Sequence, residues 1–201
     1  MSYPAQLRLK QELIEDCFTQ YEHHHGAIDI QPILPSPQAY QYRNKIEFSF
    51  GKFLQREVEG VREEIQEHWQ LGFHRQGMFS KIVDIDQCFL VSDKMHKVYS
   101  LMKAILKESG LPVYDVKTHK GLLRHLVIRE GVRTDNILVN LTVASQAWDE
   151  DDALREDREA ILKQIPQDTH LHKLITSLVI THNNGLADIV RGQESTTQVL
   201  R

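Results

Sequence analysis

Residues 121–143, GLLRHLVIREGVRTDNILVNLTV, decide the fold class of this chain. Two apolar runs, LLRHLVIRE at 122–130 and NILVNLTV at 136–143, flank the polar stretch GVRTD. A short glycine-containing loop between two β-prone runs is typical of an antiparallel hairpin. The sequence therefore predicts two paired antiparallel strands here.

Three segments upstream of this hairpin also have strand character. Residues 41–53 alternate apolar and polar side chains, which predicts a half-buried strand. The stretches 69–75 and 81–85 predict two shorter strands. The polar residues 54–69 interrupt the alternation, so we expect a hairpin loop there.

The first helix is expected at residues 4–21. Leu9, Leu13 and Cys17 recur at one-turn spacing, so these side chains share one apolar face. We expect that face, including Cys17, to pack into a core. A proline-rich connector follows the helix.

The remaining elements complete an α+β pattern. Ser92 is a suitable N-cap for a helix that ends before Gly110. An acidic helix is expected at about 151–165, and a strand at 172–183. This order predicts a largely antiparallel sheet with flanking helices. Regular βαβ alternation is missing, so no Rossmann domain is expected in this chain.

Composition excludes several classes of protein. The chain has 201 residues, of which 41% are hydrophobic, and a formal net charge of -4, which argues against disorder. It has no run of about 18 apolar residues that could span a membrane, and its N-terminus lacks a signal-peptide pattern. With only two cysteines, a disulfide framework is not expected. We expect a cytoplasmic protein without a membrane partner.

Basic and histidine side chains interrupt the predicted strands. Arginine suits bidentate contacts to phosphate and also stacks on bases, so RNA contact is one interpretation of this pattern. The alternative is that each side chain simply lies on the solvated face of its strand. No glycine-rich phosphate loop, H-E-x-x-H or C-x-x-C motif is present. The residues concerned are Arg43, Lys45, His74, Arg75, Arg124, His125 and Arg129.

Three motifs resemble one known family. YRNKIEFSFG (42–51), LGFHRQGMFSKIVDIDQC (71–88) and GLLRHLVIREG (121–131) are similar to signature segments of the bacterial RNA (uracil-5-)-methyltransferases. That family uses S-adenosylmethionine to make 5-methyluridine in ribosomal or transfer RNA. Residues 2–14 resemble the helix that follows the family's cysteine-rich segment, and the resemblance to the family extends, more weakly, through residues 180–192.

The resemblance implies a division into parts. Residues 1–25 would be the helix after the cysteine-rich segment, 26–192 a central α+β domain, and 193–201 the start of a linker. That linker would lead to a methyl-donor domain outside this chain. The family's nucleophilic cysteine adds to carbon 6 of uracil, and no residue here matches it. The resemblance therefore assigns no catalytic and no S-adenosylmethionine-binding residue to this chain, and predicts that it is inactive alone.

The resemblance also gives Cys88 a possible role. In iron–sulfur members of the family, a fourth cysteine at this position completes a [4Fe–4S] cluster with three upstream cysteines. One thiolate cannot hold such a cluster, so the resemblance implies a ligand only in the longer protein. From its position after an apolar strand alone, Cys88 is interpreted as a buried structural thiol.

The polar residues named above match recurrent positions of the family's central domain. The resemblance implies that Arg43, Lys45, His74 and Arg75, together with Arg124, His125 and Arg129, line an RNA cleft or contact a neighbouring domain. The expected partners are RNA, ribosomal ahead of transfer RNA, and the remaining domains of the enzyme. Two alternatives remain open: a stand-alone RNA-binding or adaptor module, and one half of a split methyltransferase.

Overall fold

The computed structural model describes residues 1–59, 62–144, 159–192 and 194–200. The chain divides into two compact units, Met1–Tyr42 and Arg43–Arg201. Among the residues described, no helix is both long enough and apolar enough to cross a membrane.

The first unit combines one long helix with an extended segment. Helix α1 (Tyr3–His25) has Pro4 in its first turn, where the missing N–H leaves no intrahelical bond unmade. The amide of Ile33 donates to Oε1 of Gln11 at 2.8 Å. The connector after the helix is thereby tied back to it.

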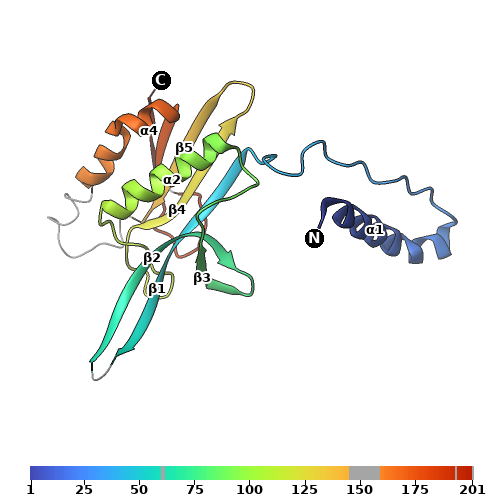
Figure 1. The fold of residues 1–201 in the computed structure, drawn as a ribbon, viewed down its shortest axis with the longest axis horizontal. Helices are drawn as coiled ribbons and strands as arrows, with labels where there is room; N and C mark the ends of the chain where they lie inside the picture. The colour runs from blue at the N-terminus through green and yellow to red at the C-terminus, as the bar shows by residue number, and fades with distance from the viewer. Residues whose placement is uncertain (60–61, 145–158, 193, 201) are drawn as a thin grey trace. The chain divides into compact units, whose positions relative to one another are not determined.

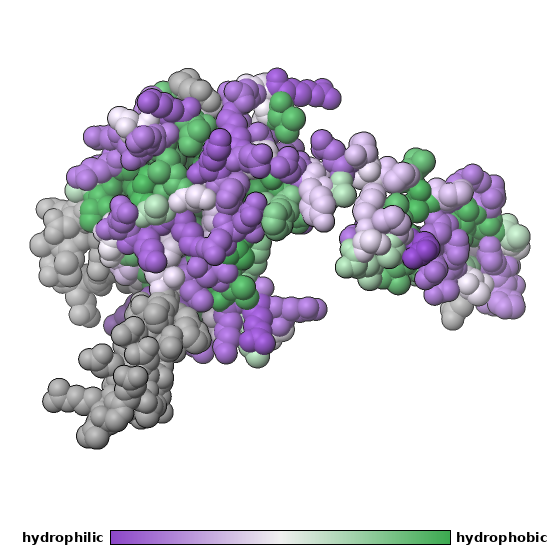
Figure 2. Space-filling model, viewed as in Figure 1, coloured by the Kyte–Doolittle hydropathy of each residue, from purple (hydrophilic) through white to green (hydrophobic). Residues whose placement is uncertain are grey.

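Most of the large apolar side chains of α1 are exposed. Leu9, Leu13 and Ile14 each leave more than two-fifths of their surface accessible, and Figure 2 shows hydrophobic patches on this helix. The prediction that Cys17 belongs to a core is wrong, because its side chain is exposed. One helix with one extended segment has too little apolar surface to enclose a core.

The second unit is built on a sheet of seven strands in the order β3-β2-β1-β4-β5-β6-β7 (Figure 1). All neighbouring strands are antiparallel except β5 and β6, which are parallel. The predicted α+β class with a largely antiparallel sheet is therefore confirmed. The strands are β1 (Lys45–Glu59), β2 (Arg62–Arg75), β3 (Met78–Asp84), β4 (Leu123–Gly131), β5 (Asn136–Val143), β6 (Ser177–His182) and β7 (Glu194–Val199).

The predicted loop at 54–69 is wrong. Strands β1 and β2 pair from Ser49 opposite Gly72 out to Glu59 opposite Arg62, so most of that stretch is a long hairpin (Figure 1). Backbone hydrogen bonds between strands need no apolar side chains. An apolar–polar alternation marks only strands that have one face packed on a core.

Two predictions near the C-terminus also need correction. The strand expected at 172–183 is shorter than predicted. It is β6 (Ser177–His182), and residues 172–174 belong to helix α4 (Thr169–Leu174) instead. Asp168 caps that helix by accepting from the amides of His170 and Leu171. Residues 194–199, expected to start a linker, form the edge strand β7.

The expected acidic helix at 151–165 falls mostly outside the described residues. Residues 159–164 are helical, and a 3-10 turn, η2 (Ile165–Gln167), follows them.

Helix α2 (Asp93–Glu108) packs on one face of the sheet. Ser92 caps it as predicted, because its Oγ accepts from the amide of Met95 at 3.1 Å. Tyr99 fixes the helix to the sheet by donating its hydroxyl to the carbonyls of Leu71 and Ile85. The core that α2 shares with β1 and β4 includes Phe48, Met95, Val98, Met102, Leu106, Leu126 and Ile128.

Both α2 and α4 lie on the same side of the sheet in Figure 1. Strand alternation then sends every second side chain to the opposite face. Phe48, opposite Leu126 in register, belongs to the helix-covered core. Ser49, opposite His125, belongs to the other face.

Replacing Leu126 by Ala should destabilise the second unit by about 2–5 kcal/mol, because a fully buried leucine leaves a cavity when it is truncated. Leu126 has 0% of its surface exposed. The matched control is Leu186→Ala, since that side chain is 71% exposed. Urea denaturation measures both variants, and equal free energies of unfolding would contradict this description of the core.

Candidate nucleic-acid interface

A row of polar side chains crosses the face of the sheet that the helices leave open. Ser49 on β1 lies opposite His125 on β4, His125 opposite Thr142 on β5, and Thr142 opposite Thr181 on β6. All four residues are buried. Buried polar groups require partners, and residues 183–192 supply several of them by folding over this row.

Arg124 holds the start of that loop. The β4–β5 register shifts between Leu123 and His125, and a bulge of this kind re-aims side chains. The guanidinium of Arg124 donates to the carbonyl oxygens of Asn183 at 2.9 Å, of Gly185 at 2.6 Å and of Ala187 at 2.6 Å. Three carbonyls from one loop thus converge on one buried cation.

The environment of Arg124 is apolar on its other side. Its guanidinium carbon lies 4.4 Å from the ring centroid of Tyr114, a cation–π distance. Burial lowers the pKa of Arg124 from its ordinary value, whereas the charges of Tyr114 and Asp188 raise it. Arg124 has only 2% of its surface exposed, so it holds the loop from inside the domain.

Further hydrogen bonds hold the rest of the loop. The hydroxyl of Thr142 donates to the carbonyl of Val190 at 3.2 Å, and Asn183 donates through Nδ2 to the carbonyl of Ile189 at 2.7 Å. Asn183 also accepts from the amide of Gly185 at 2.9 Å. Loop residues 183–192 are therefore fixed at several points along their length.

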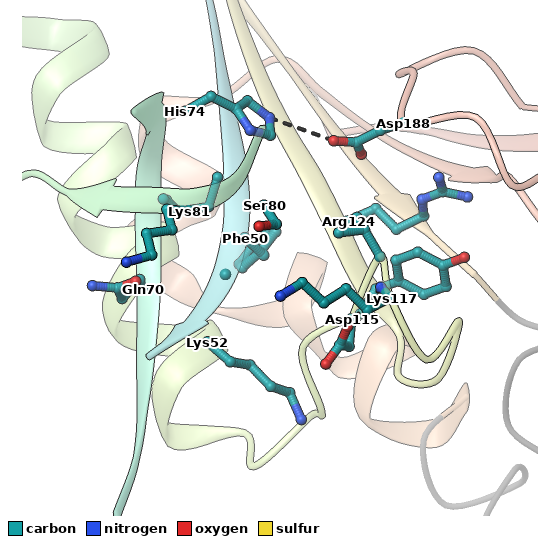
Figure 3. Close-up of a pocket in the computed structure, with 14 residues that line it drawn as sticks. Phe50, Lys52, Gln70, His74, Ser80, Lys81, Asp115, Lys117, Arg124 and Asp188 are labelled. Carbon is teal, nitrogen blue, oxygen red and sulfur yellow. Dashed lines mark hydrogen bonds and ion pairs between the residues drawn. The ribbon is translucent and has the colours of Figure 1, made fainter. Parts of the chain in front are cut away.

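Four side chains form a polar network beneath this loop. Ser49 Oγ lies 3.0 Å from His74 Nε2 and 3.3 Å from His125 Nδ1. Asp188 Oδ1 lies 2.9 Å from His125 Nε2, and its Oδ2 lies 3.4 Å from His74 Nε2, the contact drawn in Figure 3. Both histidines therefore join β1 to the loop through one hydroxyl and one carboxylate.

The carboxylate of Asp188 is stabilised in its ionised form. The hydrogen bond from His125 holds the pKa of Asp188 below its ordinary value, and electrostatic interactions with His125, His74 and Arg124 act in the same direction. Burial opposes this shift. The charged groups around Asp188 therefore outweigh its desolvation.

A pocket of about 470 Å³ opens beside the network (Figure 3). Lysines reach it from three parts of the chain, Lys52 on β1, Lys81 on β3, and Lys117 in the segment after α2. None of the three was among the predicted site residues; the sequence signal for Lys117 was its place in a run of basic residues at 117–133. The lining also includes Gln70, His74, Ser80, Tyr114, Asp115, Arg124 and Asp188.

The predicted RNA-contacting residues fall into separate groups. Lys45 and Arg129 are exposed register partners on β1 and β4, and the exposed Arg43 directly precedes β1. Lys45 also lies 3.4 Å from a carboxylate oxygen of Glu47. Arg75 is exposed at the end of β2.

Of the other three predicted residues, His74 and His125 belong to the polar network, and Arg124 lies beside it. His74 is partly exposed, whereas Arg124 and His125 are each only 2% exposed. The side chains of Arg124 and His125 bind the loop at 183–188. Direct RNA contact by this pair stays a prediction, and the structure gives both residues a positioning role.

Cys88 is partly buried and packs against the hydrophobic core. Within the described parts of the chain, no group of three or more His, Cys, Asp or Glu side chains is arranged to hold a metal. The sequence contains only two cysteines. A cluster with four thiolate ligands therefore does not fit the residues of this chain by themselves.

Asp188→Asn should flatten the acid limb of the stability profile. Because the folded-state pKa of Asp188 lies below its ordinary value, its ionised form stabilises the fold above that ordinary value. This contribution disappears as the pH falls through the lowered folded pKa. Wild type should thus lose more unfolding free energy than the variant on acidification from about pH 5 to about pH 3.

Denaturant unfolding at a series of pH values measures this difference. Asp86→Asn is the control, since the Asp86 side chain is fully exposed, at 101%. Parallel profiles for wild type and Asp188→Asn would contradict the role given to the His125–Asp188 pair.

Comparison with known proteins adds sequence relatives and structural neighbours. No family model matches the chain. An uncharacterized RNA methyltransferase of Chlorobaculum tepidum is 34% identical over 169 residues, which is 82% of this chain and 34% of that protein. An uncharacterized RNA methyltransferase of Caldanaerobacter subterraneus is 30% identical over 192 residues, covering 94% of this chain and 38% of that protein. The chain thus spans little more than a third of the length of these relatives.

One structural neighbour is a crystal structure of a Pyrococcus abyssi tRNA (uracil-54, C5)-methyltransferase in complex with S-adenosyl-L-homocysteine. The match has a TM-score of 0.62 at 20% identity and covers 99% of this chain and 39% of that one. This likeness shows a shared fold. Together with the sequence relatives, it bears out the resemblance of the three motifs: the chain belongs to the family of these RNA methyltransferases.

Proposed function

We propose that this chain is the central, RNA-contacting domain of an S-adenosylmethionine-dependent RNA (uracil-5-)-methyltransferase. The observation that carries the proposal is the similarity of 82–94% of the chain to proteins named RNA methyltransferases. The uracil-5 reaction is supported by the three sequence motifs and by the neighbour's described activity. The RNA would be ribosomal or transfer RNA.

In this proposal the domain binds and positions RNA, and the methyl transfer itself uses groups outside this chain. Methylation at carbon 5 of uracil requires a nucleophile at carbon 6 and a bound methyl donor. Neither cysteine is suited to the first role, because Cys17 lies on helix α1 with no charged partner shown beside it among the described residues, and Cys88 packs against the core. S-adenosylmethionine is accordingly assigned to the rest of the enzyme.

The proposed RNA-binding surface consists of Arg43, Lys45 and Arg129, hereafter the basic edge. All three side chains are exposed, and the register places Lys45 beside Arg129. Clustered cations attract the phosphate backbone even when the net charge of a protein is negative. Arg75 at the end of β2 is a candidate for a further phosphate contact.

Cys88 is proposed as one cluster ligand if the whole enzyme holds a [4Fe–4S] group. Its support is the match of IVDIDQC to the family segment. The other three thiolates would have to come from outside the described chain, and no step of the proposed RNA binding depends on them.

Replacing all three residues of the basic edge by Ala should weaken binding to a uridine-containing single-stranded RNA. Each lost phosphate contact removes about 0.7 from the slope of log affinity against log salt for single strands, so the triple variant should lose about 2. Fluorescence anisotropy at several salt concentrations measures both the affinity and the slope.

The control is Lys107→Ala, because that exposed lysine lies in the last turn of α2 on the opposite side of the sheet. Its affinity and salt slope should equal those of wild type. If the triple variant keeps its fold and also keeps the wild-type slope, the basic edge does not bind RNA.

A further inference from the structure

The turn at residues 115–121, hereafter the basic turn, is held in one conformation by its own backbone. Asp115 donates its amide to the carbonyl of Lys120 at 2.7 Å, and its carbonyl accepts from the amide of His119 at 2.8 Å. Its carboxylate Oδ1 also accepts from the amide of Lys117 at 2.7 Å. Asp115 therefore ties three positions of the turn together.

Two positions of the basic turn have left-handed backbone conformations. His119 has a φ of 58°, which is uncommon for a residue with a side chain. Its ring Nδ1 lies 3.0 Å from the hydroxyl of Tyr114, so a contact with the domain holds it there. Gly121 has a φ of 106°, and a Cβ at this position would lie 2.1 Å from the carbonyl oxygen of Val113. Sparsely populated backbone conformations cluster at functional sites, which makes the turn a candidate for contact with a ligand.

The basic turn presents two lysines to solvent. Residues 117–120 are all exposed, and no hydrogen bond or ion pair joins the ammonium group of Lys117 or of Lys120 to another of the described residues. An exposed, unpaired lysine adds little to the stability of a domain, whereas its charge attracts phosphate. A fixed backbone that carries unpaired cations is well suited to contact with a polyanion.

The basic turn lies on the same side of the sheet as the basic edge. Lys117 lines the pocket shown in Figure 3, and so does Gly51 of β1. Alternation along β1 places Lys45, Ser49 and Gly51 on one face, which is the face that the helices leave open. Six positions of β1 separate Lys45 from Gly51, which corresponds to about 20 Å along the strand. The turn and the edge are thus two separate cationic groups on one surface.

We propose that the basic turn and the basic edge bind phosphates of the same RNA strand at positions about 20 Å apart, and that Lys117 and Lys120 make the contact at the turn. This inference rests on the function proposed above and adds the length of RNA that the domain holds. A stacked strand advances about 3.4 Å per nucleotide, so about six nucleotides reach from one group to the other. Lysine suits the contact at the turn, because it binds phosphate as a point charge without demanding one fixed geometry.

Oligouridylates of four and of ten nucleotides test the proposal by fluorescence anisotropy with the full chain. The shorter strand cannot reach both cationic groups, whereas the longer strand reaches both at once and gains affinity from the second contact. The dissociation constant for the shorter strand, divided by that for the longer one, is the length ratio. For Lys117→Ala/Lys120→Ala the length ratio should be smaller than for wild type by about tenfold or more.

The matched control is Lys97→Ala/Lys107→Ala. It removes the same charge from two exposed lysines of α2, on the side of the sheet that the helices cover, and its length ratio should equal that of wild type. Circular dichroism and the melting temperature check that the turn variant keeps its fold. Lys117→Gln/Lys120→Gln, which keeps the aliphatic part of each side chain and removes only the charge, should lower the length ratio to the same extent.

The outcomes separate this inference from the proposed function. A folded turn variant with the wild-type length ratio would overturn the inference and leave RNA binding by the basic edge intact. A wild-type length ratio no larger than that of the triple variant of the basic edge would also overturn it, because that variant has only one of the two groups. If wild type binds neither strand, the proposed function itself fails, and the inference fails with it.

Discussion

The buried guanidinium of Arg124, bound by three carbonyls of the loop 183–192, is the interaction on which the open face of the sheet depends. It holds the loop against the polar row of Ser49, His125 and Thr142. Asp188 reaches the two histidines only because the loop is held there. Removing one partner of such a buried charged contact leaves the other partners unsatisfied, which is strongly destabilising. Arg124 and Asp188 also line the pocket beside the network, so its wall is part of the same arrangement.

The two faces of the sheet therefore have different tasks. One face packs α2 and α4 over Phe48, Leu126 and neighbouring apolar side chains, which stabilise the domain through the hydrophobic effect. The other face carries the polar network, the pocket and, along β1 and β4, the basic edge. A rigid apolar layer beneath a charged surface is well suited to positioning a polyanion. This separation supports a role in binding RNA for a member of an RNA methyltransferase family.

Much of the fold followed from local periodicity, whereas the site did not. Strand β5, helix α2 and its Ser92 cap were predicted because each buries one face against the core, so period and cap chemistry agree. The long β1–β2 hairpin was missed because its polar sequence lacks that signal. Arg124 looked like a surface cation; its partners lie about 60 residues away, starting with Asn183 at a separation of 59. Likewise, the sheet topology brings the residues that line the pocket together from distant parts of the chain, and no sequence spacing predicts that.

The most direct measurement is ultraviolet crosslinking of the full chain to a uridine-containing single-stranded RNA, followed by mass spectrometry of the crosslinked peptides. Crosslinks should map to β1, β2, β4 and the segment around Lys117, which carry the basic edge and the pocket. An excess of unlabelled RNA should lower the yield of these crosslinks, and so should high salt. Crosslinks confined to α2 and α4, or insensitive to salt, would contradict an RNA-binding role for the open face of the sheet.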